Sequence, residues 1–174
     1  MAGHGAPRPT GGIEPANELD LGWLRNVRFV ARILATVELE RALVEHGLDP
    51  QLARAAVDDP LLGARAVLVE PHRDGPERYD AIESGREPDF LVIAEPSTEG
   101  RLAAVLARHD EGPAGRYLAP SGGLDAARRL AAASGVRLSR PALGPFGASA
   151  LVLGGPLGGE IVVLLDEAAV PSGP

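Results

Sequence analysis

Residues 90–113, FLVIAEPSTEGRLAAVLARHDEGP, decide the fold of this chain of 174 residues. The apolar run Phe90–Ala94 is typical of a buried strand. Ser97 or Thr98 then supplies a helix cap, and the apolar residues of Leu102–Leu106 recur at helical spacing. The turn-forming residues that end the stretch lead into another strand. The order strand, helix, turn and strand predicts an α/β fold in which one unit ends and the next begins.

The same order of elements is predicted on both sides of this stretch. Strands are expected at 24–33, 64–70, 90–94, 116–119, 136–138, 149–153 and 161–165, with helices between Thr36 and Gly47, up to His109, and at 124–133. The segment Asp58-Asp59-Pro60 is interpreted as a turn. The elements form a weak internal repeat of roughly 80 residues, indicated by their order rather than by residue identity.

Charge and composition exclude several classes of protein. The net charge is −7, all 17 basic residues are arginine and no basic run is present, which is a poor match for nucleic acid. The absence of cysteine excludes disulfides and thiolate ligands. Apolar runs such as Ile161–Leu165 are too short to cross a membrane, and the N-terminus lacks the pattern of a signal peptide. We therefore expect no nucleic-acid or membrane partner and a cytoplasmic location.

Two segments lack periodicity. Residues 1–20 are rich in Gly, Pro and Ala, which predicts a flexible N-terminal tail ahead of a single domain at 21–174. Residues 71–88 are polar and predict a long excursion from the core. The excursion contains His72 beside carboxylates, where an imidazole is either a general base, part of a surface metal site, or simply solvated.

Several strings together resemble a known superfamily. Glu95-Pro96-Ser97 followed by Arg108–Gly112 resembles the joint between the two modules of methylmalonyl-CoA epimerases and related glyoxalase-like proteins. The other similar strings are Leu24–Val27 for a first strand, Leu124–Arg128 and Ala133–Arg137 for the second helix and its exit, and Gly158-Gly159 before the last strand. From Leu24 to Glu167 the chain therefore resembles the vicinal oxygen chelate superfamily, which also includes bleomycin resistance-like proteins.

The resemblance implies an α/β (α+β) fold of tandem βαβββ modules, here at about 24–96 and 113–167, which form a curved mixed sheet. In metal-dependent members four side chains from the first and last strands of both modules hold a divalent ion inside the cup of this sheet. These positions fall on Asn26, Val92, a residue near Gly115, and Val163. Valine and glycine cannot ligate and asparagine is a weak ligand, so neither a metal site nor a cofactor is expected.

The resemblance also places candidate ligand-binding residues in the cup. If side chains alternate along the first strand, Asn26 and Arg28 face the cup. An arginine there needs an anionic partner, either a ligand or a carboxylate at the rim. Tyr117 is a candidate hydrogen-bond donor to a ligand, or a core residue. The candidate ligand-binding residues are Asn26, Arg28, Phe90, Val92, Tyr117 and Val163.

Acid–base chemistry, if the chain performs any, has three candidate residues: Glu95, Tyr117 and His72. Glu95 follows an apolar strand and points either into the cup or to water. His46 and His109 are better explained as cations in the last turn of a helix.

These observations favour a glyoxalase-like protein without the usual metal ligands. We expect it to bind a small anionic or amphipathic metabolite in its cup, either to sequester it or to isomerise or cyclise it, so whether it is an enzyme stays open. One alternative is a metal-dependent lyase, isomerase or dioxygenase of the same superfamily; another is a non-catalytic protein-interaction module. A homodimer is expected from the resemblance, with the apolar strand Ile161–Leu165 as local support.

Overall fold

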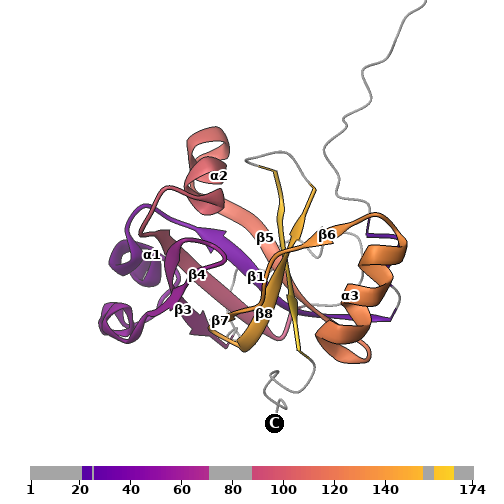
Figure 1. Ribbon diagram of the computed structural model, residues 1–174. Coiled ribbons are helices and arrows are strands. Elements are labelled where there is room, and N and C mark those ends of the chain that lie inside the picture. Colours follow the sequence, from indigo (N-terminus) through magenta and orange to yellow (C-terminus); the bar gives the residue numbers. More distant parts are fainter. Residues whose placement is uncertain (1–20, 25, 71–87, 155–158, 167–174) are drawn as a thin grey trace, which may run out of the picture.

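The computed structural model describes residues 21–24, 26–70, 88–154 and 159–166 (Figure 1). The elements are β1 (Val27–Ala35), α1 (Leu39–Glu45), the 3₁₀ helix η1 (Pro50–Ala55), β2 (Val57–Asp59), β3 (Ala64–Val69), β4 (Phe90–Pro96), α2 (Arg101–His109), β5 (Gly112–Pro120), α3 (Gly123–Ala133), β6 (Arg137–Leu138), β7 (Ala142–Gly144), β8 (Gly147–Leu153) and β9 (Ile161–Leu165). The predicted tail and His72 lie outside the described residues, as does the predicted excursion except for Pro88.

The strands form one curved mixed sheet in the order β2-β3-β4-β1-β5-β9-β8-β6, with β7 also paired to β8. β1 and β5, the first strands of the two halves, are antiparallel neighbours at the centre of the sheet. Each has the last strand of its own half as a parallel neighbour, β4 for β1 and β9 for β5. The two halves thus repeat one arrangement outward from the centre, and the predicted fold of tandem βαβββ units is confirmed.

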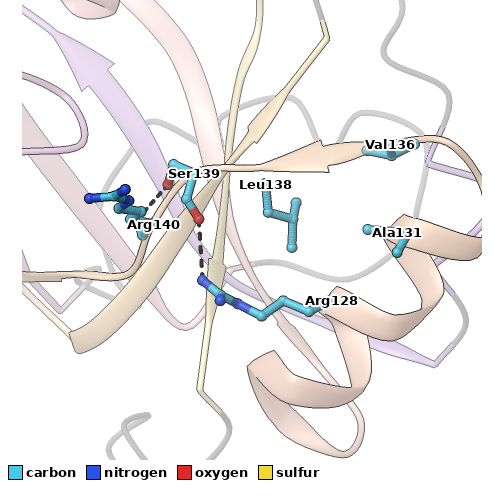
Figure 2. Close-up of a pocket in the computed structure, with 7 residues that line it drawn as sticks. Arg128, Ala131, Val136, Leu138, Ser139 and Arg140 are labelled. Atoms are coloured by element: carbon cyan, nitrogen blue, oxygen red, sulfur yellow. Dashed lines mark hydrogen bonds between the residues drawn. The ribbon is translucent and has the colours of Figure 1, made fainter.

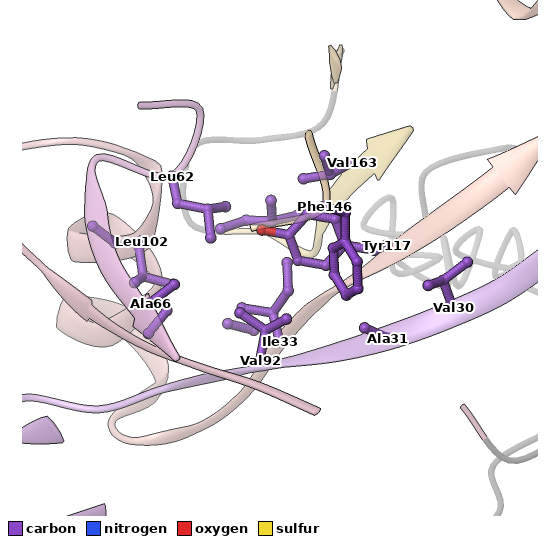
Figure 3. Packing of buried hydrophobic residues seen from close by; sticks show 14 of the residues in the cluster. Val30, Ala31, Ile33, Leu62, Ala66, Val92, Leu102, Tyr117, Phe146 and Val163 are labelled. Carbon is purple, nitrogen blue, oxygen red and sulfur yellow. The ribbon is translucent and has the colours of Figure 1, made fainter. Parts of the chain in front are cut away.

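Three hydrophobic clusters hold the sheet and its helices together. Helix α1 and η1 pack against one half of the sheet through Leu39, Leu43 and Ala53. Helix α3 packs against the other half, and Figure 1 shows the two groups of helices at opposite sides of the molecule. The third cluster fills the interior of the curled sheet, and α2 contributes Leu102 and Val105 to it (Figure 3). We call this interior the cup.

Side chains on β1 do not alternate as the sequence predicts. A β-bulge lies between Phe29 and Ala31, so Val30 is an extra residue with no register partner on β5. Phe29 consequently packs in the cluster beneath α3, whereas Ala31 and the next alternate residue, Ile33, lie in the cup. Regular alternation along the whole first strand therefore does not hold, because a single inserted residue reverses the direction of the side chains that follow.

Short elements and helix starts differ from the prediction. The elements η1, β2 and β7 were not predicted, because they are too short to show a period. Helix α1 begins three residues after Thr36, whose hydroxyl donates to the Glu111 carboxylate. Helix α2 likewise starts at Arg101, after Gly100. Among the described residues no helix is long and apolar enough to span a membrane.

Glu111 joins the start of the second half to the first helix. Its Oε1 accepts hydrogen bonds from the Thr36 hydroxyl and the Val37 amide, both at 2.7 Å. The Arg41 guanidinium donates to both carboxylate oxygens, at 2.6 and 2.7 Å. These donors, with Arg41 the largest influence, lower the pKa of Glu111 from 4.5 to about 2.

We predict that Glu111→Gln lowers the free energy of unfolding by about 1 kcal/mol at pH 7, a modest value because the carboxylate is partly exposed. Since the folded-state pKa is depressed, this contribution is present above pH 4.5 and is lost as the pH falls towards about 2. Urea denaturation at pH 7, 4 and 3 measures it. The control Glu45→Gln, which also removes a partner of Arg41, should cost less than about 0.5 kcal/mol. A variant whose deficit persists unchanged at low pH contradicts the assignment.

Candidate functional site

The cup contains four of the six predicted ligand-binding residues. Phe90, Val92, Tyr117 and Val163 belong to one interior cluster, and none is more than 6% exposed (Figure 3). They come from β4, β5 and β9, the strands at the centre of the sheet. The structure therefore brings these residues together, as closely packed core side chains.

Asn26 and Arg28 lie outside this cluster. Asn26 precedes β1, is exposed, and has a left-handed backbone with φ of 53°. Its carbonyl accepts hydrogen bonds from the amide and hydroxyl of Ser121. The Arg28 Nε lies 3.2 Å from an Asp89 carboxylate oxygen, and the two side chains are 44% and 49% exposed. Arg28 is thus paired with a carboxylate at the rim, which is one of the two anionic partners expected from the sequence; the other is a ligand.

The two-fold relation between β1 and β5 identifies which first-strand residue matches Gly115. Ala31 pairs with Tyr117, and Ile33 pairs with Gly115. A two-fold axis midway between these antiparallel pairs exchanges Ala31 with Gly115 and Ile33 with Tyr117. The first-strand position equivalent to Gly115 is therefore Ala31, and the assignment of Asn26 to it was wrong by five residues.

The last strands of the two halves follow the same relation. Val92 is the parallel neighbour of Ile33, and Val163 is the parallel neighbour of Tyr117. The same two-fold axis therefore also exchanges Val92 with Val163. The four positions that correspond to the expected metal ligands are Ala31, Gly115, Val92 and Val163. Their side chains are only hydrogen, methyl or isopropyl groups, which have no lone pair for a cation. Within the described ranges no group of three or more His, Asp or Glu side chains is placed to hold a metal ion.

Gly115 is required by the packing of the sheet. A β carbon at this residue would overlap the carbonyl oxygen of Ile161 on β9 and lie 2.8 Å from the carbonyl carbon. Real β carbons do not approach backbone atoms so closely, so β5 and β9 can adopt this spacing only with glycine here. A histidine at this position is incompatible with the present backbone.

A buried carboxylate lies against the cup, at a residue whose sequence context predicts only a turn. Asp59 ends β2 and is fully buried. Its Oδ2 accepts a hydrogen bond of 2.5 Å from the Tyr117 hydroxyl. Its Oδ1 accepts from the backbone amides of Leu61 and Leu62, at 2.9 and 3.2 Å. The carboxylate thus caps its own turn and also binds a residue 58 positions away.

The same carboxylate closes the curled sheet. β2 and β7, which lie at opposite ends of the sheet, are in contact, and a β carbon on Gly144 of β7 would lie 3.0 Å from Asp59 Oδ2. The Phe146 ring packs edge-on against Tyr117, with 5.1 Å between centroids, and against Phe90 at 5.7 Å. Burial, followed by the nearby Asp59 charge, raises the pKa of the Tyr117 hydroxyl well above 10.

Glu95, the other described acid–base candidate, is occupied by an ion pair. Its carboxylate lies 2.7 Å from the Arg65 guanidinium on the adjacent strand β3. This contact raises the pKa of Arg65. The Tyr117 hydroxyl donates to Asp59 instead, so these two acid–base candidates have different hydrogen-bond partners.

Comparison with solved structures identifies the fold. No family model and no curated protein matches the chain. A variant of Streptomyces coelicolor methylmalonyl-CoA epimerase in complex with 2-nitronate-propionyl-CoA is 19% identical, with a TM-score of 0.58 over 84% of this chain and 98% of the epimerase.

Two further epimerase structures are similar. A methylmalonyl-CoA epimerase in complex with methylmalonyl-CoA and ammonium is 18% identical, with a TM-score of 0.57 over 84% of this chain and 99% of that chain. The enzyme from Mycobacterium tuberculosis is 16% identical, with a TM-score of 0.54 over 79% and 85% of the two chains. The chain has the fold of the vicinal oxygen chelate superfamily.

Proposed function

We propose that this chain is a glyoxalase-like protein that binds a small anionic metabolite in its cup without a metal ion, either to sequester it or to isomerise or cyclise it in the cytoplasm. One observation carries the proposal. The positions that the resemblance assigns to metal ligands hold apolar residues, whereas a carboxylate–phenol pair, Asp59 and Tyr117, supplies polar groups at the same apolar interior. If a ligand separates the two side chains, the carboxylate can accept a hydrogen bond from the ligand and the phenol can donate one to it.

Arg28 is the group best suited to the anionic end of such a ligand. Its partner Asp89 is half-exposed, so a ligand carboxylate can compete for the guanidinium. Arg28 pairs with Ala119, which lies two residues from Tyr117 along β5, or about 7 Å. Since the Asp59 carboxylate repels a second anion, we expect the anionic group at Arg28 and a hydroxyl or carbonyl near Tyr117.

Binding in the cup requires side chains to move. Phe90 and Tyr117 fill the interior in the present arrangement. β2 and β7 are in contact but have no mutual backbone pairing in the described part of the chain. Since the hydrogen bond from Tyr117 to Asp59 is the side-chain contact that fixes β2 against the centre of the sheet, we expect the cup to open at the seam between β2 and β7.

We predict that Arg28→Gln weakens binding of methylmalonate or methylmalonyl-CoA at least about tenfold, because a charge-assisted hydrogen bond is lost. Methylmalonyl-CoA is the ligand of one structurally similar epimerase, and methylmalonate is its small anionic part. Isothermal titration calorimetry gives the affinities. The control Arg108→Gln removes an exposed arginine from α2 and should leave them unchanged.

Two results contradict the proposal. Equal weakening by both substitutions indicates non-specific attraction. Stoichiometric zinc, iron, manganese or nickel in the purified protein, measured by mass spectrometry, favours the metal-dependent lyase, isomerase or dioxygenase instead.

A non-catalytic interaction module is the second candidate function. The packed rings of Phe90, Tyr117 and Phe146 favour it, because a filled cup stabilises the fold without leaving space for a ligand. Titrations in which neither anion binds the wild-type protein support this candidate over the first.

We also propose a homodimer, but the apolar strand Ile161–Leu165 no longer supports it. The apolar strand β9 lies between β5 and β8, so it is not an exposed edge that needs a partner. The expectation now rests on the resemblance alone, and sedimentation equilibrium tests it.

A further inference from the structure

A shallow groove lies outside the cup, between α3 and the segment that contains β6 (Figure 2). Its volume is about 300 Å³. Ala131, Val136 and Leu138 form the apolar part of its lining, and Arg128, Ser139 and Arg140 form the polar part. We call this site the α3–β6 groove.

The arginines give the groove a charge opposite to that of the whole protein. Residues 126–140 contain four arginines and no carboxylate, whereas the chain carries a net charge of −7. Arg128 donates one hydrogen bond, from Nη2 to the Ser139 carbonyl at 3.2 Å, which leaves most of its five N–H groups for another acceptor. Arg140 is exposed, and Figure 2 shows the Arg128 side chain reaching Ser139 from α3, whereas the Arg140 side chain extends away on the other side of Ser139.

A neighbouring depression differs in charge and so restricts where an anion can sit. It has a volume of about 290 Å³ and shares Arg128, but Asp125 and Asp166 also line it. These two carboxylates repel an anion from that side of Arg128. The favourable position for a negative group is therefore the side that faces Arg140.

We infer that the α3–β6 groove binds a small amphipathic anion, with a carboxylate or phosphate group held by Arg128 and Arg140 and a short apolar body against Val136 and Leu138. The volume is at the low end of the range for ligand pockets, which limits the apolar body to a short chain or single ring. Arginine holds such anionic groups through paired N–H donors.

This site is independent of the function proposed for the cup. Helix α3 packs on the outer surface of the sheet, through a cluster that contains Ala127 and Leu164. The interior cluster with Tyr117 and Val163 is a separate set of residues. A ligand in the groove thus touches none of the cup residues, and the two sites are tested with different variants.

The test uses octanoate as the probe, followed by backbone-amide NMR of the full chain. We expect saturable shifts at residues 128–140 and no binding of octylamine or octanol. Arg128→Gln and Arg140→Gln should each raise the dissociation constant about tenfold, because each removes a charged donor. The matched control Arg129→Gln changes the neighbouring exposed arginine, which does not line the groove, and should have little effect.

Other outcomes overturn the inference. Equal binding of octanol means that only the apolar surface is recognised. Equal weakening by Arg129→Gln means that the attraction is non-specific. Shifts confined to β4, β5 and β9 would mean that octanoate binds in the cup instead. The absence of any shift at millimolar octanoate would mean that the groove does not bind amphipathic anions.

Discussion

Replacing Gly115 with alanine is expected to lower the free energy of unfolding by about 3 kcal/mol, near the upper end of the usual cost of overpacking. The added β carbon would collide with the backbone of Ile161, and a backbone carbonyl cannot rotate away as a side chain can. β5 and β9 must separate where they are parallel neighbours. Urea denaturation, with the slope and midpoint both fitted, measures the change.

Gly100→Ala is the matched control for this substitution. It makes the same chemical change and reduces the freedom of the unfolded chain equally. Its β carbon would lie 3.4 Å from the nearest atom, the Leu62 carbonyl oxygen, and its backbone is extended. We expect a cost below about 1 kcal/mol, within the range of ordinary surface substitutions. Equal stability of the two variants contradicts the close approach of β5 and β9.

The same collision bears on metal chemistry. A histidine at residue 115 cannot be accommodated as a ligand unless the backbone first moves away from Ile161. The equivalent first-strand residue is Ala31, and the valines at 92 and 163 present only methyl groups. We therefore regard the apolar centre of the cup as a packed feature of this chain, in which several residues would have to change together to form a site.

The order of elements was predictable because long periodic segments carry their own signal. β1, α2 and β9 show strand or helix patterns in the sequence alone, and their order matches the fold. Register was harder to predict. The bulge at Val30 leaves no trace in the pattern of apolar residues, yet it reverses the faces of the rest of β1. The assignment of Asn26 failed separately, because only the pairing of β1 with β5 shows that Ala31 is the position equivalent to Gly115.

Asp59 was missed for a different reason. Its sequence context, Asp58-Asp59-Pro60, is typical of an exposed turn, and its turn contacts to Leu61 and Leu62 are indeed local. Its burial comes from Tyr117 and Gly144, which the chain supplies from distant strands. A pairing across the cup depends on how far the sheet curls, which no local pattern encodes.

Replacing Asp59 with alanine is expected to lower the free energy of unfolding by about 3 kcal/mol, because two buried donors and one partly buried donor lose their acceptor. These donors are the Tyr117 hydroxyl and the amides of Leu61 and Leu62. Hydrogen exchange should accelerate most at 57–59 and 142–144, the two strands that meet beside the buried carboxylate, and less at the centre of β1.

Tyr117→Phe separates the two roles of this carboxylate. It keeps the turn contacts of Asp59 but removes the link across the cup, so we expect a smaller loss of about 1–2 kcal/mol with the same local pattern of exchange. In the wild-type protein, the raised pKa of Tyr117 adds stability that is present below pH 10 and is lost as the pH rises further. The phenylalanine variant should lack that part of the alkaline loss. Uniformly faster exchange across all strands, in either variant, means that Asp59 stabilises the whole fold rather than the seam between β2 and β7.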